Sequence, residues 1–253
     1  MSASSIPHFT FQPEKVPTGI VYHYIKSNLD GSNPARVYIR MADDETLDVW
    51  KFEAHNADAA HVLAHMDWSS FSADRIQSWV VTSDGERQER AALTVSARDS
   101  SCTIRLGELS ETVHVALMPV HLYNFDFISL GTTLPYWNDP RGAVEIGILQ
   151  PNFDPNVNGV IRYDGTVVIR YAGEEERGGV FCRKYTIGGE GLQHQQGCIW
   201  LGNDLPHVVD MEIPVPDNPA WNSFKFRLVS VRSMLEGAWK SFIGGEIQKL
   251  DPV

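Results

Sequence analysis

Hydrophobic and polar side chains alternate with a period of two over several stretches of this chain. Val37, Ile39 and Met41 fall on one side of an extended segment, and Tyr38 and Arg40 fall on the other. The same alternation recurs in two later segments, 181–187 and 224–228. A period of two predicts β-strands that place one face on a core and the other toward water or a cavity.

Further strand candidates follow one another at short intervals along the chain. They are 19–26, 47–54, 76–82, 88–97, 101–106, 112–118, 143–149, 194–201 and 206–213. Many short strands at regular spacing predict a mainly β fold, with a single large antiparallel sheet curled into a barrel or half-barrel. The length of 253 residues suits one domain over 1–253. We expect residues 1–16 to be extended or poorly ordered.

Asp-Gly pairs mark candidate turns between these segments. They are Asp30-Gly31, Asp84-Gly85 and Asp164-Gly165. This dipeptide readily adopts the positive φ of two-residue hairpin turns. Two β-branched runs between Gly159 and Tyr171 flank Asp164-Gly165, which predicts a tight hairpin there. The charged run Glu174–Arg177 is interpreted as a solvated loop.

A helical period appears near the C-terminus, over 233–243. Ser233 and Glu236 have the spacing of a capping box, which satisfies backbone N–H groups at a helix start. The apolar residues that recur at helical spacing are Met234, Leu235, Ala238, Trp239, Phe242 and Ile243. Gly244-Gly245 predicts the helix end. We expect this amphipathic helix to pack on the sheet or to plug its open end.

The segment 57–66 has features of both a helix and a strand. Its alanines favour a helix, whereas the Val62-Leu63 step favours a strand, which we prefer. On a helix, His61 and His65 would share a face and could bind one metal ion. On a strand they would lie ~13 Å apart, too far for a shared ion. The strand interpretation therefore predicts no metal site.

A candidate catalytic group lies between residues 118 and 127. Among large apolar side chains it holds His121, Tyr123 and Asp126. Burial there would raise the pKa of Asp126 and lower that of His121, toward the range useful for acid–base catalysis. In the alternative interpretation, Tyr123 and Asp126 anchor the turn that leaves the strand. The sequence leaves both interpretations open.

Charge and motifs exclude several classes of function. The net charge is −11, from 21 Lys and Arg against 32 Asp and Glu, which argues against a nucleic-acid partner. No apolar run approaches the ~20 residues of a membrane span, so no membrane insertion is predicted. The sequence lacks the motifs of phosphate-binding loops, dinucleotide sites and zinc proteases, and no cofactor is predicted. An oligomer stays possible.

The chain start and the cysteines indicate the compartment. Residues 1–9 lack the basic and apolar regions of a secretory signal. Cys102, Cys182 and Cys198 form no C-x-x-C pair, and reduced thiols are the preferred interpretation. We therefore expect a cytoplasmic protein.

Large aromatic side chains are frequent on the predicted strands. The chain has seven tryptophans, and bulky indoles can line a hydrophobic pocket, although core packing is their commoner use. The candidate ligand-binding residues are Tyr38, Trp50, His65, Trp79, Tyr123 and Trp200.

The stretch from Gly165 to Trp200 resembles a known family. A strand, the acidic Glu174, the Gly179-Val-Phe181 step and the closing Ile199-Trp200 pair resemble the C-terminal half of bacterial proteins of unknown function with a lipoprotein-carrier (LolA/LolB-like) half-barrel. The resemblance covers about a quarter of the chain. It implies a curved antiparallel sheet around a helix, with an apolar concavity, and it transfers no catalytic residue.

Three hypotheses about function follow. The leading one is the binding of a small hydrophobic or amphipathic molecule in the concavity of a β-barrel-like fold. The second is a cofactor-independent enzyme, an isomerase, cyclase or hydratase, that uses His121, Tyr123 or Asp126 in the same pocket. The third is a structural component without a ligand, which a filled interior and an exposed apolar patch would favour.

Overall fold

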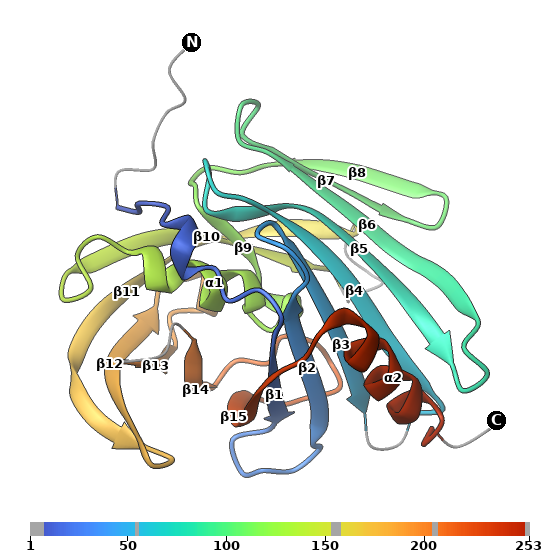
Figure 1. The fold of residues 1–253 in the computed structure, drawn as a ribbon. Helices are drawn as coiled ribbons and strands as arrows, with labels where there is room; N and C mark the ends of the chain where they lie inside the picture. Colours follow the sequence, from blue (N-terminus) through green and yellow to red (C-terminus); the bar gives the residue numbers. More distant parts are fainter. Residues whose placement is uncertain (1–7, 54–55, 153–157, 204–206, 251–253) are drawn as a thin grey trace.

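One rolled β-sheet forms most of this protein (Figure 1). The computed structural model describes residues 8–53, 56–152, 158–203 and 207–250. Within these ranges the strands are β1 (Ile20–Ser27), β2 (Ala35–Met41), β3 (Thr46–Glu53), β4 (Asp58–Asp67), β5 (Ser72–Thr82), β6 (Arg87–Ser96), β7 (Ser101–Leu106), β8 (Leu109–His114), β9 (Val120–Leu122), β10 (Ala143–Pro151), β11 (Ile161–Arg177), β12 (Val180–Gly188), β13 (Gln196–Gly202), β14 (Val208–Ile213) and β15 (Phe224–Ser233). The helices are α1 (Ile128–Thr133) and α2 (Glu236–Ile247), and short 3₁₀ turns are η1 (Pro13–Lys15), η2 (Tyr123–Phe125), η3 (Leu134–Tyr136) and η4 (Glu190–Leu192).

All fifteen described strands join one sheet, in the order β8-β7-β6-β5-β4-β3-β2-β1-β15-β14-β13-β12-β11-β10-β9. The pair β9–β10 is parallel, and the other described pairs are antiparallel. The two ends of the sheet approach each other through side chains: the Val120 N–H donates to Ser72 Oγ of β5 at 2.9 Å, and the Ile161 N–H donates to Glu111 Oε2 of β8 at 3.2 Å. The predicted mainly β fold, one large sheet curled into a half-barrel, is confirmed.

The alternation of side chains along each strand separates an inner from an outer face. Val37 and Ile39 belong to the large hydrophobic cluster that fills the inside of the rolled sheet. Tyr38, between them, belongs to a second cluster on the outside. A third, small cluster around Trp200 also lies on the outside, because Ile199 and Leu201 point inward.

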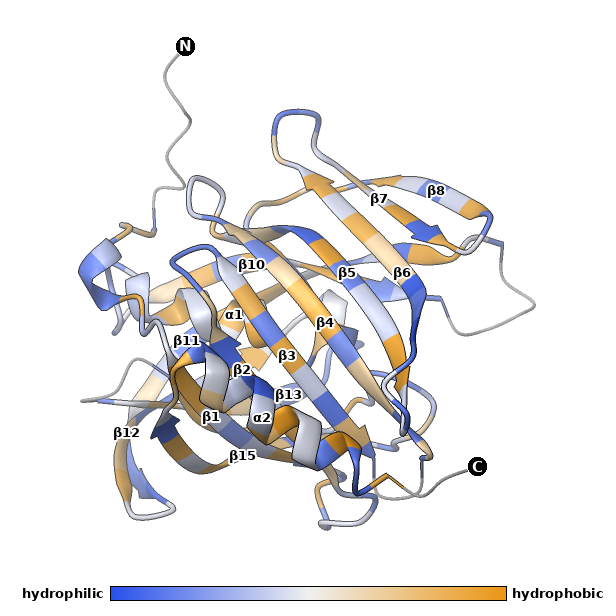
Figure 2. Cartoon of the chain, turned by 45° about the vertical axis from the view of Figure 1, so that its right-hand side comes forward, coloured by the Kyte–Doolittle hydropathy of each residue, from blue (hydrophilic) through white to orange (hydrophobic). Residues whose placement is uncertain are grey.

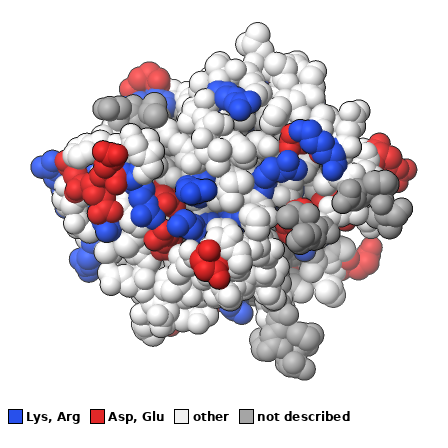
Figure 3. All heavy atoms as spheres, turned by 90° about the horizontal axis from the view of Figure 1, so that it is seen from below, with Lys and Arg blue, Asp and Glu red and all other residues white. Residues whose placement is uncertain are grey.

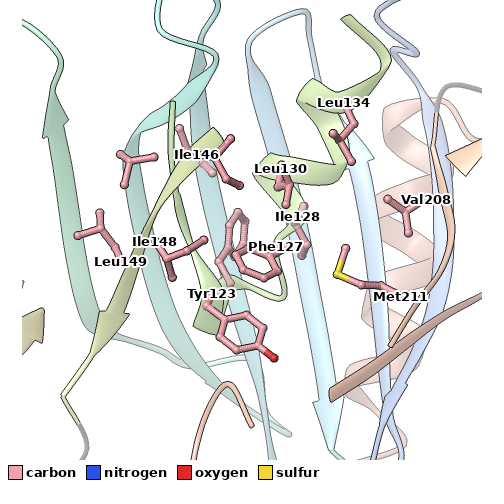
Figure 4. Close-up of a cluster of buried hydrophobic side chains, with 14 of the residues drawn as sticks. Tyr123, Phe127, Ile128, Leu130, Leu134, Ile146, Ile148, Leu149, Val208 and Met211 are labelled. Carbon is pink, nitrogen blue, oxygen red and sulfur yellow. The ribbon is translucent and has the colours of Figure 1, made fainter. Parts of the chain in front are cut away.

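Helix α1 occupies the interior. Figure 4 shows Phe127 and Leu130 between Ile148 of β10 on one side and Met211 of β14 on the other. Each of these side chains is almost fully buried. The element that fills the half-barrel is therefore α1 with its flanking turns, and the C-terminal helix does not plug it.

Helix α2 instead packs on the outside of β1, β2 and β3, as one of the two predicted arrangements requires (Figure 2). Trp239 and Ile243 are buried there. The predicted capping box is wrong, because Ser233 is the last residue of β15 and no side chain caps the helix at Leu235. The predicted stop is also wrong, since Gly244 lies inside a helix that continues to Ile247.

The predicted hairpin between Gly159 and Tyr171 is also wrong. The register of β11 against β10 shifts at Asp164, which is an extra residue in an otherwise continuous strand. Asp-Gly therefore forms a β-bulge here, and Gly165 supplies the positive φ of 103° that the bulge uses. The charged run Glu174–Arg177, predicted as a loop, is the end of the same strand and pairs with β12.

The segment 57–66 forms strand β4, which confirms the strand interpretation. His61 and His65 lie on its outer face, four residues apart along the strand. At the N-terminus, residues 1–7 of the predicted extended segment lie outside the described residues. Phe9 is buried and bridges to Trp137, and Pro13–Lys15 form η1.

Candidate functional site

The inside of the half-barrel contains a small apolar hollow, which we call the interior cavity. Its volume is about 50 Å³. It is lined by Lys15, Pro17, Tyr22, Tyr24, Ile39, Met41, Leu47, Asp126, Phe127, Ile128, Gly131, Thr132, Pro135, Tyr136, His207, Val208, Met211 and Phe226. The inner face of strands β1–β3, β14 and β15 forms one side of the cavity. Helix α1 with its flanking residues forms the opposite side.

The alternation along β1 supplies two aromatic residues of this wall. Tyr22 and Tyr24 point inward, and His23 between them points outward. The Tyr24 ring stacks on Phe226 with centroids 4.2 Å apart, and its hydroxyl donates to the Val208 carbonyl at 2.7 Å. These two contacts connect Tyr24 of β1 to both β15 and β14.

His207 is the unusual residue of the interior cavity. Its side chain is buried, and neither ring nitrogen has a hydrogen-bond partner within the described part of the chain. Its ring packs against Tyr22 at 4.9 Å. Burial lowers the pKa of His207 to about 4, so the imidazole is neutral at neutral pH and offers one donor and one acceptor. Buried polar groups normally have partners, and this imidazole is free to bond a polar group in the cavity.

A buried charge cluster, Lys26, Lys51, Asp126 and Asp217, lies beside the interior cavity. Lys26 Nζ is 2.8 Å from Asp126 Oδ1 and 2.5 Å from Asp217 Oδ2. Lys51 Nζ is 2.7 Å from Asp126 Oδ2. The indole of Trp221 covers the Lys26 ammonium at 4.0 Å. Two positive and two negative charges thus balance one another away from water.

The two carboxyl groups of the charge cluster have pKa values displaced in opposite directions. Burial would raise the pKa of Asp126, but the ammonium groups of Lys26 and Lys51 outweigh it and hold this pKa below its ordinary value. Burial raises the pKa of Asp217 to about 6, against the opposing effect of Lys26. The predicted rise for Asp126 is therefore wrong, because two lysines from distant strands reach it.

The three predicted catalytic residues do not meet in one hollow. His121 Nδ1 is 3.0 Å from Ser129 Oγ, and burial lowers the pKa of His121 to about 3, in the predicted direction. The Tyr123 hydroxyl donates to the Val215 carbonyl at 2.5 Å. Asp126 borders the interior cavity but is held by the two lysines. No hydrogen bond joins any two of these three residues within the described structure, and their acid–base role stays a prediction.

Most of the predicted ligand-binding residues lie on the outer face. Trp50 and Trp79 flank His61 beneath α2, and His65 bonds Asp74 Oδ1 at 2.6 Å. The remaining outer-face candidates are Tyr38 and Trp200. The expectation that these five line the concavity is therefore wrong, because alternation separates two faces without indicating which one becomes concave.

Among the residues that line the interior cavity, Asp126 is the one that was predicted as a site residue from the sequence. Tyr22 and Tyr24 lie in the predicted strand 19–26, and their alternation with His23 was a usable signal. The sequence around His207 gave no such signal, because the residues that surround its side chain come from β1 and α1, far away in sequence. Within the described residues, no group of three metal-ligating side chains lies together. No described helix is long and apolar enough to cross a bilayer.

Comparisons with known proteins find similar solved structures at low sequence identity. No protein-family model matches the sequence, and curated proteins yield no significant match. A β-barrel-like protein of the domain of unknown function DUF1849 from Brucella abortus is similar, at 10% identity over 85% of this chain and 96% of that one, with a TM-score of 0.45.

Two lipoprotein-related structures are also similar. A putative outer membrane lipoprotein-sorting protein domain from Vibrio parahaemolyticus matches at 8% identity over 89% of this chain and 90% of that one, with a TM-score of 0.29. The lipoprotein LppX from Mycobacterium tuberculosis matches at 8% identity, over 85% and 88%, with a TM-score of 0.25. One of these two matches is thus a lipoprotein-sorting domain, and the other is a lipoprotein. Similarities this distant carry no argument about function.

Proposed function

We propose that this protein binds a small hydrophobic or amphipathic molecule in the interior cavity, with a polar group of that molecule against His207. The observation that carries the proposal is a neutral, buried imidazole in an apolar hollow, with no hydrogen-bond partner among the described residues. A hydroxyl or carbonyl group could bond this imidazole while its apolar part contacts Met211 and Phe226.

The size of the interior cavity limits the ligand. At about 50 Å³ it is smaller than the ~150 Å³ engineered cavity that binds benzene. A short alkyl group with a hydroxyl end is therefore the appropriate probe. Of the three candidate acid–base residues, only Asp126 borders this cavity, and its carboxylate is already paired with Lys26 and Lys51, which disfavours the alternative of an acid–base enzyme.

Ligand-observed NMR titration with short 1-alkanols tests the proposal. We expect saturable binding that weakens about fivefold in His207→Phe, which removes the polar partner. His207→Gln, the matched control, should stay within about twofold because it keeps a donor and an acceptor. Met211→Ala should enlarge the hollow and add binding of benzene. The proposal fails if no alkanol binds saturably, or if His207→Phe binds as tightly as the wild type.

A further inference from the structure

A second hollow lies on the opposite face of the sheet, beneath α2, and we call it the outer pocket. Its volume is about 210 Å³. It is lined by Val21, His23, Tyr38, Ser230, Arg232, Met234, Phe242 and Glu246. These residues come from β1, β2, β15, the β15–α2 connection and α2, and none of them lines the interior cavity.

Two polar atoms of the outer pocket are buried without a partner. His23 Nε2 and Ser230 Oγ make no hydrogen bond to any described residue. The two residues are directly opposite each other in the β1–β15 ladder, so their side chains lie next to each other on the sheet surface beneath the outer pocket. The His23 ring also stacks on Tyr38, with centroids 4.6 Å apart, which fixes its orientation.

The charge balance of the outer pocket is positive. The buried carboxylate of Glu246 is already neutralised, because Arg36 Nη1 lies 3.0 Å and Lys249 Nζ 2.5 Å from its oxygens. The Tyr38 hydroxyl also donates to Glu246 Oε2 at 3.2 Å. No acidic side chain among the described residues forms an ion pair with Arg232, which leaves its guanidinium for a ligand.

This local charge contrasts with the net charge of −11 for the whole chain. Figure 3 shows both basic and acidic groups on one face of the molecule. Burial, with the nearby Arg232 and Arg36, lowers the pKa of His23. A neutral imidazole can still donate one hydrogen bond to an anion.

The remaining walls of the outer pocket are apolar. Val21, Met234 and Phe242 line it, and the Tyr38 ring meets Phe242 edge-on, with centroids 5.0 Å apart and planes at 89°. Such walls suit a flat apolar group. The volume exceeds the ~150 Å³ cavity that holds benzene and is below the ~300 Å³ of pockets for drug-sized ligands.

We propose that the outer pocket binds a small organic carboxylate with an aromatic or compact apolar body, about the size of a substituted benzene ring. The carboxylate pairs with Arg232 and accepts hydrogen bonds from His23 Nε2 and Ser230 Oγ. The ring lies against the side chains of Tyr38, Met234 and Phe242. Arg232 supplies most of the selectivity, because charge-assisted bonds to a planar carboxylate are the strongest contacts available there.

Titration of the whole chain with benzoate tests this proposal, with uncharged benzyl alcohol as the comparison ligand. We expect saturable benzoate binding in the millimolar range, weakened about tenfold or more in Arg232→Gln and about threefold in Ser230→Ala. Arg227→Gln, an exposed arginine on the same strand, is the matched control and should bind benzoate like the wild type. Absence of saturable binding, or equal binding by Arg232→Gln, overturns the proposal.

An NMR readout on the wild-type protein distinguishes the two hollows and does not depend on the folding of a variant. Benzoate should shift the imidazole resonances of His23 and leave those of His207 unchanged. A benzoate-induced shift at His207 alone, or at neither histidine, would contradict an anion site beneath α2.

Discussion

At the scale of single residues, the buried charge cluster is the most demanding feature of the protein. Asp126 and Lys26 are both almost fully buried, and their charges are stable there because each meets opposite charges. Asp126 and Phe127 also adopt left-handed backbone conformations, with φ of 55° and 50°. Such conformations cost ~1–3 kcal/mol each and persist where surrounding contacts hold them. The ion pairs of Asp126 are contacts of this kind.

Replacement of Asp126 by Asn tests this view. The variant leaves two ammonium groups against the single carboxyl of Asp217, and an uncompensated buried charge costs ~3–5 kcal/mol. We expect the free energy of unfolding to fall by about that amount in urea titrations. The control, Glu89→Gln, removes an exposed ion pair with Arg105 and should change the free energy of unfolding by less than ~1 kcal/mol. An equal loss of unfolding free energy in the two variants would contradict a stabilising role for the charge cluster.

At the scale of elements, α2 is held to the sheet by a narrow set of contacts. Trp239 and Ile243 pack against Tyr38 and Trp50 in the outer cluster, and the Trp239 indole N–H donates to Asp48 Oδ2 at 2.7 Å. The other side of α2 is exposed to solvent, and Leu235 at its start is 84% exposed. The helix therefore depends on one face and on few large side chains.

Trp239→Ala should release α2 from the sheet. Large-to-small changes of buried aromatic residues cost ~3–5 kcal/mol, and here the loss falls on one terminal helix. We expect the α2 amides to lose most of their protection in hydrogen exchange while the amides of the central strands keep theirs. Leu235→Ala is the control and should leave protection unchanged. Wild-type protection of α2 in the Trp239 variant would contradict the packing described.

At the scale of the whole molecule, one core joins both halves of the chain. The inner cluster takes residues from β1–β8 and from β9–β15. Strands β1 and β15, from opposite ends of the chain, are neighbours in the sheet. The interior is also nearly filled, because the interior cavity is only about 50 Å³. Helix α1 thus leaves only a small hollow within the apolar concavity that the sequence resemblance implied.

A shared core predicts cooperative unfolding. We expect circular dichroism and tryptophan fluorescence to give coincident urea transitions, since neither half buries an inner cluster of its own. Two separated transitions, one for each half of the sheet, would show instead that the predicted single domain over 1–253 divides into two units.

The sequence by itself determined most of the strands and the assignment of alternate side chains to the two faces of the sheet. Period-two alternation is a local property, so Val37 and Tyr38 could be assigned to opposite faces without any knowledge of the fold. The tertiary structure alone decided which face became concave, because the contacts that place α1 inside and α2 outside join residues far apart in the sequence. It also turned the Asp164-Gly165 pair into a bulge, since β10 continues to pair beyond it. The meeting of Asp126 with Lys26 and Lys51 is likewise a contact between distant strands, which a local pattern does not encode.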